Sequence, residues 1–467
     1  MFKHYITLSA VIVATSLSSP ASVSSDSTTH SPINHNIDFT DTEKLSRDTL
    51  DSLAHLTPDE IKTERLKNQH RVVYFGENPV ASVDSLRHLI EMFYVDQFRH
   101  FQDPLAPYFL MMSRDAKLAL GIGGAVRMRG WFDFDGAMPV NGFVPFMIPV
   151  PKDPAQKRRV GGTPGGTAIF LRVIGRNKTL GDISGYIQID FSGANNVTPK
   201  LKKAYATIFD WTIGYASTTF CDPQSDVPTI DGAGQNGRLS GTAMLIRYAH
   251  TFKDRWQLAA SVELPHTMAD GDNVNTKAIN DWMPDYAAFV QYQWAHNSHV
   301  RLSGIIRTLP YRNLIAQKNK SVIGWGTQLS TAFTPARMIT VYGAANIGRG
   351  YSSCMNDLSV GNYDLVGDPG NPGVLYAPMA YGLNCGIKYN FTNNIYSCIA
   401  LGHSRYLPRN GVSPTDYKYG QYAAINFFWD MTTRLQVGAE YLIGRRVNFN
   451  HEHGSANRVD VLFQFSF

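Results

Sequence analysis

Two arginines, Arg127 and Arg129, stand one residue apart in a segment where apolar residues alternate with small or polar ones. In an extended strand, residues at positions i and i+2 lie on the same face. Guanidinium groups keep their positive charge and bind carboxylates and phosphates through paired hydrogen bonds. Arg172, in the next predicted strand, extends the row, so the sequence predicts a basic ladder for carboxylate or phosphate groups.

Further basic residues occupy the less apolar face of other predicted strands. The predicted basic set is Arg127, Arg129, Arg172, Lys203, Arg247, Arg301 and Arg307, and the acids on the same faces are Asp133, Asp190, Glu263 and Glu440. Residues 117–467 carry a net charge of +10, whereas residues 1–116 carry −5. Acids of the strand region are therefore too few to cancel its basic residues. For any single arginine, neutralisation by an acid such as Asp133 remains the alternative.

Residues that could support catalysis or bind a metal have no convincing spacing. The candidates are His266, His296, His299, His403 and the run His451-Glu452-His453. None has a nucleophile or a glycine-flanked serine at a typical distance in the sequence. The His-Glu-His run could bind a metal, but such a run in a loop is more often solvated. We expect no enzyme activity, metal, cofactor or nucleic-acid partner.

The basic residues belong to segments with the two-residue period of β-strands. From Leu118 to Asp133 the alternation lasts about 16 residues, whereas strands of soluble proteins usually have about five or six. The segment from Arg458 to Phe467 alternates in the same way. Such long strands are typical of a closed barrel in an outer membrane, apolar outside and polar inside.

Sixteen segments share this pattern, which is an even number. They are 117–134, 166–176, 182–192, 201–210, 212–220, 239–252, 255–264, 285–295, 299–309, 321–333, 337–348, 379–391, 394–406, 419–430, 433–447 and 457–467. Tight and long connections alternate between them, as in outer-membrane barrels, and sixteen strands leave an aqueous lumen. The predicted fold class is an all-β transmembrane barrel of about 16 antiparallel strands with a short N-terminal helical periplasmic segment. A secreted soluble all-β protein is the alternative.

Composition agrees with a barrel. The 467 residues include 39 Gly, 23 Tyr and 25 Phe, and the mean hydropathy is −0.20. Beyond the N-terminus no apolar stretch approaches the roughly 18 to 20 residues of a membrane-spanning helix, which excludes a helical membrane bundle. The high aromatic content excludes a disordered chain.

The N-terminal quarter of the chain has a different pattern. Residues 1–25 are predicted to be a signal peptide, because Lys3 precedes the apolar run Ile6–Leu17 and small residues follow; an uncleaved anchor is the alternative. Residues 26–116 are predicted to form a helical periplasmic segment. Its helix signals are the start Thr57-Pro58-Asp59-Glu60 and an apolar face from Val83 to Tyr94. Residues 117–467 are the predicted barrel.

Two long loops could narrow the lumen. Loop 135–165 carries the apolar patch Phe143–Val150 and the basic run Lys157-Arg158-Arg159, and loop 221–238 carries Asp222, Asp226 and Asp231. Either could fold inward. The apolar patch of the first loop could instead cover a subunit interface.

Four cysteines could form two disulfides. Cys221 and Cys354 lie in predicted outer loops and could meet. Cys385 and Cys398 lie in strands joined by a tight turn, and a register shift of one residue decides whether they share a face. Both pairings stay open.

The order of several motifs resembles the DcaP-like porins of Gram-negative outer membranes. These motifs are Gly121-Ile122-Gly123-Gly124 to Trp131-Phe132-Asp133, Leu201-Lys202-Lys203-Ala204-Tyr205, Trp211 to Phe220, Ile246-Arg247-Tyr248 and Val262-Glu263-Leu264-Pro265. The resemblance implies a homotrimer of barrels in outer-membrane lipid, a periplasmic N-terminal extension, and uptake of small anions such as dicarboxylates through an arginine-lined eyelet. The terminal Phe467 resembles the signal by which the barrel-assembly machinery recognises its substrates.

The chain departs from this family in its N-terminal region. Pro58, Gly76 and Pro79 interrupt any long coiled coil there, which leaves trimerisation through that segment open. A structural or adhesin-type barrel is the competing function.

Overall fold

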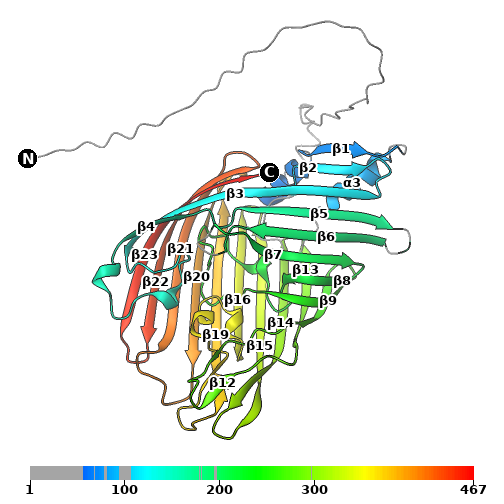
Figure 1. Cartoon of the computed structure of the whole chain (residues 1–467). Coiled ribbons are helices and arrows are strands. Elements are labelled where there is room, and N and C mark those ends of the chain that lie inside the picture. Colours follow the sequence, from blue (N-terminus) through cyan, green and yellow to red (C-terminus); the bar gives the residue numbers. More distant parts are fainter. Residues whose placement is uncertain are drawn as a thin grey trace, which may run out of the picture. The chain divides into compact units, whose positions relative to one another are not determined.

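The computed structural model describes residues 56–67, 69–77, 81–93, 107–177, 179, 181–193, 197–295 and 297–467. All of them belong to one compact unit, 42–467. Most form one antiparallel sheet that curves until its last strand meets its first barrel strand (Figure 1). The predicted signal peptide lies outside the described residues.

Sixteen antiparallel strands close the barrel, as the sequence predicted. They are β3 (Leu118–Asp135), β5 (Ala168–Asn177), β6 (Gly181–Asp190), β7 (Lys200–Ile208), β8 (Trp211–Ser217), β9 (Thr242–Phe252), β10 (Trp256–Glu263), β13 (Asp285–Ala295), β14 (Ser298–Asn313), β15 (Lys318–Ala336), β16 (Ile339–Arg349), β19 (Met379–Asn390), β20 (Ile395–Leu407), β21 (Tyr417–Asp430), β22 (Leu435–Asn448) and β23 (His453–Ser466). The predicted bounds differ from these by four residues at most. The seam pairs β23 with β3, and Val461 lies opposite Gly130.

Short strands complete the sheet at its edges. β4 (Arg159–Thr163) pairs with the second half of β3, and β12 (Thr276–Ala278) pairs with the end of β14. A separate small sheet contains β11 (Ala269–Asp270), β17 (Leu365–Gly367) and β18 (Leu375–Tyr376). These pieces belong to the long-loop end of the barrel.

The two faces of the barrel follow the predicted alternation. On β3, Met128 is 60% exposed, whereas Arg129 is 6% exposed. On β23, Val461 is 53% exposed and Asp460 is fully buried. The sheet therefore turns apolar side chains outward and polar or charged side chains inward, which is the arrangement that lipid on the outside requires.

The N-terminal segment contains the two predicted helices, α2 (Pro58–Lys67) and α3 (Val83–Met92). A capping box begins α2: the Thr57 amide donates to the Glu60 carboxylate, and the Glu60 amide donates to the Thr57 hydroxyl. Leu86 and Leu89 of α3 pack on Ile174 and other apolar residues at the turn-side end of the sheet. None of the helices in the described part of the chain is long and apolar enough to span a bilayer.

Two strands in this segment were not predicted. β2 (Phe109–Ser113) pairs antiparallel with the start of β3, and β1 (Arg71–Phe75) pairs parallel with β2. The prediction of an entirely helical segment is therefore corrected, because the sheet begins before residue 117. The five-residue strand β1 gains its backbone partners only when residues more than 30 positions away come beside it.

Candidate functional site

Both candidate loops fold into the barrel. The first inward loop is residues 136–158, and the second inward loop is residues 218–241. Phe143 of the first loop and Ile230 of the second are fully buried, and they share a cluster with inward-facing Tyr422 and Phe428 of β21. The apolar patch of the first loop therefore packs on the inner wall and does not form an outer subunit interface.

Glycines on the inner wall let the second inward loop approach closely. A Cβ atom at Gly382 would lie 2.2 Å from the carbonyl oxygen of Gly237. A Cβ atom at Gly402 would lie 2.5 Å from the carbonyl oxygen of Asn236. Both contacts require glycine, because any side chain would collide with the loop backbone. The backbone of the second inward loop therefore packs directly against the backbone of the inner wall.

Carboxylates fix the second inward loop at several points. Glu440 of β22 accepts hydrogen bonds from the backbone amides of Ile230 (3.0 Å) and Asp231 (2.8 Å). At the start of the loop, Glu263 of β10 accepts from the Thr219 amide (2.8 Å). Asp222 accepts from the Ser330 hydroxyl at 2.6 Å. Hydrogen bonds to charged acceptors are stronger than neutral ones, so these contacts hold the loop across the lumen.

A third long connection, residues 350–378 between β16 and β19, also packs inward. Its Asp357 is fully buried and accepts hydrogen bonds from the Ser404 and Tyr417 hydroxyl groups of the wall. The backbone amide of Phe146 in the first inward loop donates to the same carboxylate (2.8 Å). Asp357 therefore ties two loops and two strands together at the long-loop end.

Arg127 and Arg129, two of the three residues of the predicted ladder, both point inward and both contact the second inward loop; Arg172, the third, lies opposite Gly121, further along β3. Arg127 donates to the Ile230 carbonyl oxygen (2.7 Å). Arg129 forms ion pairs with Asp231 of the loop (2.6 Å) and Asp460 of β23 (3.0 Å). The two arginines thus share a face as predicted, and in this structure they hold the loop against the barrel seam.

A further buried pair crosses the seam. The Arg458 guanidinium of β23 donates to both carboxylate oxygens of Asp133 on β3, at 2.7 and 3.1 Å. It also donates to the Asn141 carbonyl oxygen of the first inward loop (2.7 Å). Arg458 was absent from the predicted set, although the alternation of the last strand already placed it inward.

Arg301 and Arg307, on the inner face of β14, also contact inward acids. Arg301 lies 3.4 Å from Asp222. Arg307 pairs with Asp285 of β13 (2.9 Å) and with Asp364 of the third connection (3.0 Å). Most of these paired acids therefore come from the long loops. Of the predicted wall acids, Asp133 pairs with Arg458 and Asp190 pairs with Lys202 (3.3 Å).

The remaining basic candidates line one arc of the wall, from β5 to β9. Arg172 of β5 donates to the Phe93 carbonyl oxygen at the end of α3 (3.2 Å), and Arg247 of β9 donates to the Ser217 carbonyl oxygen (3.2 Å). Lys203 of β7 is buried opposite Gln188 of β6. Aromatic rings lie between them: the tilted rings of Tyr186 and Tyr205 are in contact, with a centroid distance of 5.3 Å. The arc combines positive charge with aromatic surface.

Helix α2 contacts the inner wall at the end of the barrel where the short turns lie, opposite the long-loop end. Lys388 of β19 pairs with Asp59 of the helix (2.7 Å), and Lys62 of the helix pairs with Asp430 of β21 (2.8 Å). Lys388 and Asp430 are both buried, inward-facing residues. The helix therefore lies against the inner edge of this mouth.

The four cysteines are free thiols in the structure. Cys385 is exposed on the outer face and Cys398 is buried on the inner face, so the register separates them. Cys221 and Cys354 belong to one apolar cluster inside the long-loop end. Among the described residues, no group of three His, Cys, Asp or Glu side chains could hold a metal ion.

Comparison with known proteins identifies the family. The family model of the DcaP outer membrane protein matches residues 117–467. The crystal structure of the outer membrane channel DcaP of Acinetobacter baumannii is 19% identical, covers 75% of this chain and 98% of that chain, and superposes with a TM-score of 0.65. OmpT of Vibrio cholerae is 11% identical over 75% of this chain and 98% of its own, with a TM-score of 0.47.

None of the curated proteins compared with the chain matches it. The family match covers three quarters of the sequence and coincides with the barrel strands. The protein is thus an outer-membrane barrel of the porin type, and the chain belongs to the DcaP outer membrane protein family.

Proposed function

We propose that this outer-membrane channel passes small anionic solutes, with dicarboxylates as the candidate substrates. The observation that carries the proposal is the basic arc formed by Arg172, Lys203 and Arg247 on the wall from β5 to β9. We infer that solutes pass between this arc and the second inward loop. Fixed positive charge on a narrow channel raises the local concentration of anions.

The other predicted basic residues have a different part in this proposal. Arg129, Arg301 and Arg307 each form ion pairs with inward acids, so their charges are largely balanced. We assign to them, and to Arg127 beside them, the positioning of the loops that shape the constriction. Reversal of these charges would disturb loop packing as well as selectivity, which makes the arc residues the better test.

The experiment compares ion selectivity in planar bilayers under a salt gradient. We expect the double variant Lys203→Gln/Arg247→Gln to lower the ratio of anion to cation permeability at least twofold, with the larger change in low salt because screening is weaker there. The control Arg312→Gln/Lys318→Gln removes two charges from the long-loop ends of β14 and β15 and should leave the ratio unchanged. An unchanged ratio in the first variant would contradict an anion-selective arc.

A structural or adhesin-type barrel is the competing function, and the dense packing of three loops inside the barrel favours it. It predicts that purified protein conducts no ions. Conductance in the same bilayers, together with block by succinate added on one side, would support the channel.

We further propose that the barrel assembles as a homotrimer and that residues 26–116 lie in the periplasm. The family resemblance supports both, and the short turns and α2 occupy the same end of the barrel. Native mass spectrometry of the detergent complex tests the trimer, and protease protection in intact cells tests the location of the segment.

A further inference from the structure

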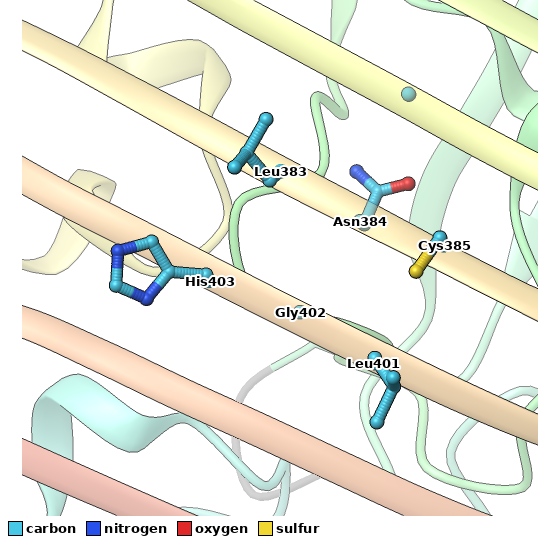
Figure 2. A pocket seen from close by; sticks show the side chains of 7 residues that line it. Leu383, Asn384, Cys385, Leu401, Gly402 and His403 are labelled. Atoms are coloured by element: carbon cyan, nitrogen blue, oxygen red, sulfur yellow. The ribbon is translucent and has the colours of Figure 1, made fainter.

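A groove lies on the outer, lipid-facing surface where β16, β19 and β20 run side by side. Figure 2 shows Leu383 and Cys385 on one strand and Leu401 and His403 on the next. The groove has a volume of about 320 Å³. The groove exists because β16, next to β19, has Gly343 opposite Cys385. Glycine has no side chain to fill the space beside Cys385.

Apolar side chains form most of this groove. Leu383 and Leu401 are each 47% exposed, and Cys385 is also exposed on the same face. Their apolar chemistry and their place on the lipid-facing surface suit a hydrocarbon chain, because lipid tails are what such a surface meets in a membrane. The groove alone does not identify its occupant.

Positively charged residues at one end of the groove indicate what its occupant is. Moving along β20 toward the long loops, the outward residues are Leu401, then His403, then Arg405. In register with His403, two strands away on β22, lies the exposed Arg445. Arg349 ends β16 on the other side of the groove and is exposed too. Three outward arginines thus surround the long-loop end of an apolar groove.

These three arginines differ from the inward-facing ones in their surroundings. Among the described residues, no carboxylate forms an ion pair with Arg349, Arg405 or Arg445; Arg405 instead lies 5.8 Å from the centroid of the Tyr419 ring. An arginine on the lipid-facing surface is unfavourable unless it sits at the interface near an anionic group. β20 and β22 are two strand spacings apart, which is about 9.6 Å, and Arg445 is level with His403, two residues before Arg405. Two long arginine side chains that lean toward each other can span this separation and reach one phosphate.

We propose that this face binds a phosphorylated glycolipid of the outer leaflet, of the lipid A type. Arg405 and Arg445 hold a headgroup phosphate, Arg349 contributes to the same positive rim, and one acyl chain occupies the groove beside Leu383 and Leu401. The long loops of such barrels face the cell exterior, which places the arginines at the outer leaflet, where that lipid resides. Tyr381 and Tyr419, whose tilted rings contact His403 from both neighbouring strands, form the aromatic belt expected at that depth.

The test is native mass spectrometry of the full delipidated chain titrated with diphosphoryl lipid A. We expect the variant Arg405→Gln/Arg445→Gln to bind it at least tenfold more weakly. The matched control Arg312→Gln changes an outward arginine that already bonds Asn319 and should bind as the unmodified chain does. Heat-modifiable migration on gels confirms that each variant remains folded.

Further measurements distinguish the contribution of the headgroup to binding from that of the acyl chain, and distinguish lipid A from other occupants of the groove. Cys385→Phe fills the groove without changing charge, and we expect it to weaken binding of lipid A as well. Phosphatidylglycerol, which carries a single phosphodiester, should bind at least tenfold more weakly than lipid A. Equal binding of the two lipids, or unchanged binding by both variants, would overturn the proposal. So would a cross-link from position 385 to a second copy of the chain, since that would make the face a subunit interface.

Discussion

Replacing Glu440 with glutamine tests whether the second inward loop forms the constriction. Glu440 is 2% exposed, and its two carboxylate oxygens accept from the Ile230 and Asp231 amides and from the Asn426 side chain. Glutamine has nearly the same size, but its NH₂ group must face one of these donors. The variant therefore changes the anchor without opening a cavity.

The expected magnitude follows from those contacts. Losing a hydrogen bond to a charged acceptor costs about 1.5–3 kcal/mol, and a buried amide left without an acceptor adds to that cost. A net loss of about 2–4 kcal/mol corresponds to a change of roughly 30-fold to several hundredfold in the population of detached loop. Arg129 still pairs with Asp231, so the loop should detach transiently and not permanently.

Single-channel recording in planar bilayers measures this change. We expect Glu440→Gln to show frequent brief transitions to a higher conductance, because a detached loop widens the lumen. The control Glu452→Gln alters an exposed carboxylate in the turn before β23, where it accepts from the Asn450 side chain. If Glu440→Gln folded normally and its current traces matched those of the control, the loop would not be the constriction.

Three further predictions concern the ends of the chain. Removing Phe467, which exchanges two backbone hydrogen bonds with Gly124, should slow the appearance of the heat-modifiable band during assembly, and an unchanged rate would leave only a packing role. Deleting residues 26–110 should leave a folded barrel, because the β23–β3 seam stays intact. Its unitary current should be larger, because α2 no longer lies against the mouth through its ion pairs. Failure to fold would instead make this segment part of the barrel core. Burial lowers the pKa of His70 to about 4. As the pH falls, the undocked segment therefore binds a proton at His70 before the docked segment does, and this proton favours undocking. Docking of the segment should weaken by up to about 3 kcal/mol between pH 6.5 and pH 4 and should stay constant above pH 6.5. Hydrogen exchange at pH 7 and pH 5 measures this, and His70→Gln should abolish the pH dependence if the imidazole causes it.

The barrel strands and their faces could be predicted from the sequence because lipid imposes a simple pattern. A strand that spans the membrane must turn apolar side chains to lipid at every second position, so residues such as Met128, Val461 and Phe463 mark the outer face without knowledge of their partners. The tight and long connections then give the polarity of each strand. This information is local, and a two-residue period carries it.

The partners of the inward charges depended on the tertiary structure. Arg129 meets Asp231 and Arg307 meets Asp364, and these pairs form only because long loops fold back into the lumen. Nothing in the alternation of a strand specifies which loop lies above it. The same limit explains why the sequence could name two candidate inward loops but could not say that both pack inside, with a third beside them.

Register was likewise decided by the closed sheet. Cys385 and Cys398 occupy opposite faces because their strands pair with Lys388 opposite Cys398, and a shift by one residue would have placed them together. β1 and β2 could not be predicted for a related reason. A short strand forms no backbone hydrogen bonds within itself and is stable only when a neighbouring strand supplies them. The sequence by itself determined the period, the strand number and the inward direction of the polar residues, whereas contacts between distant segments determined which inward arginines pair with loop acids.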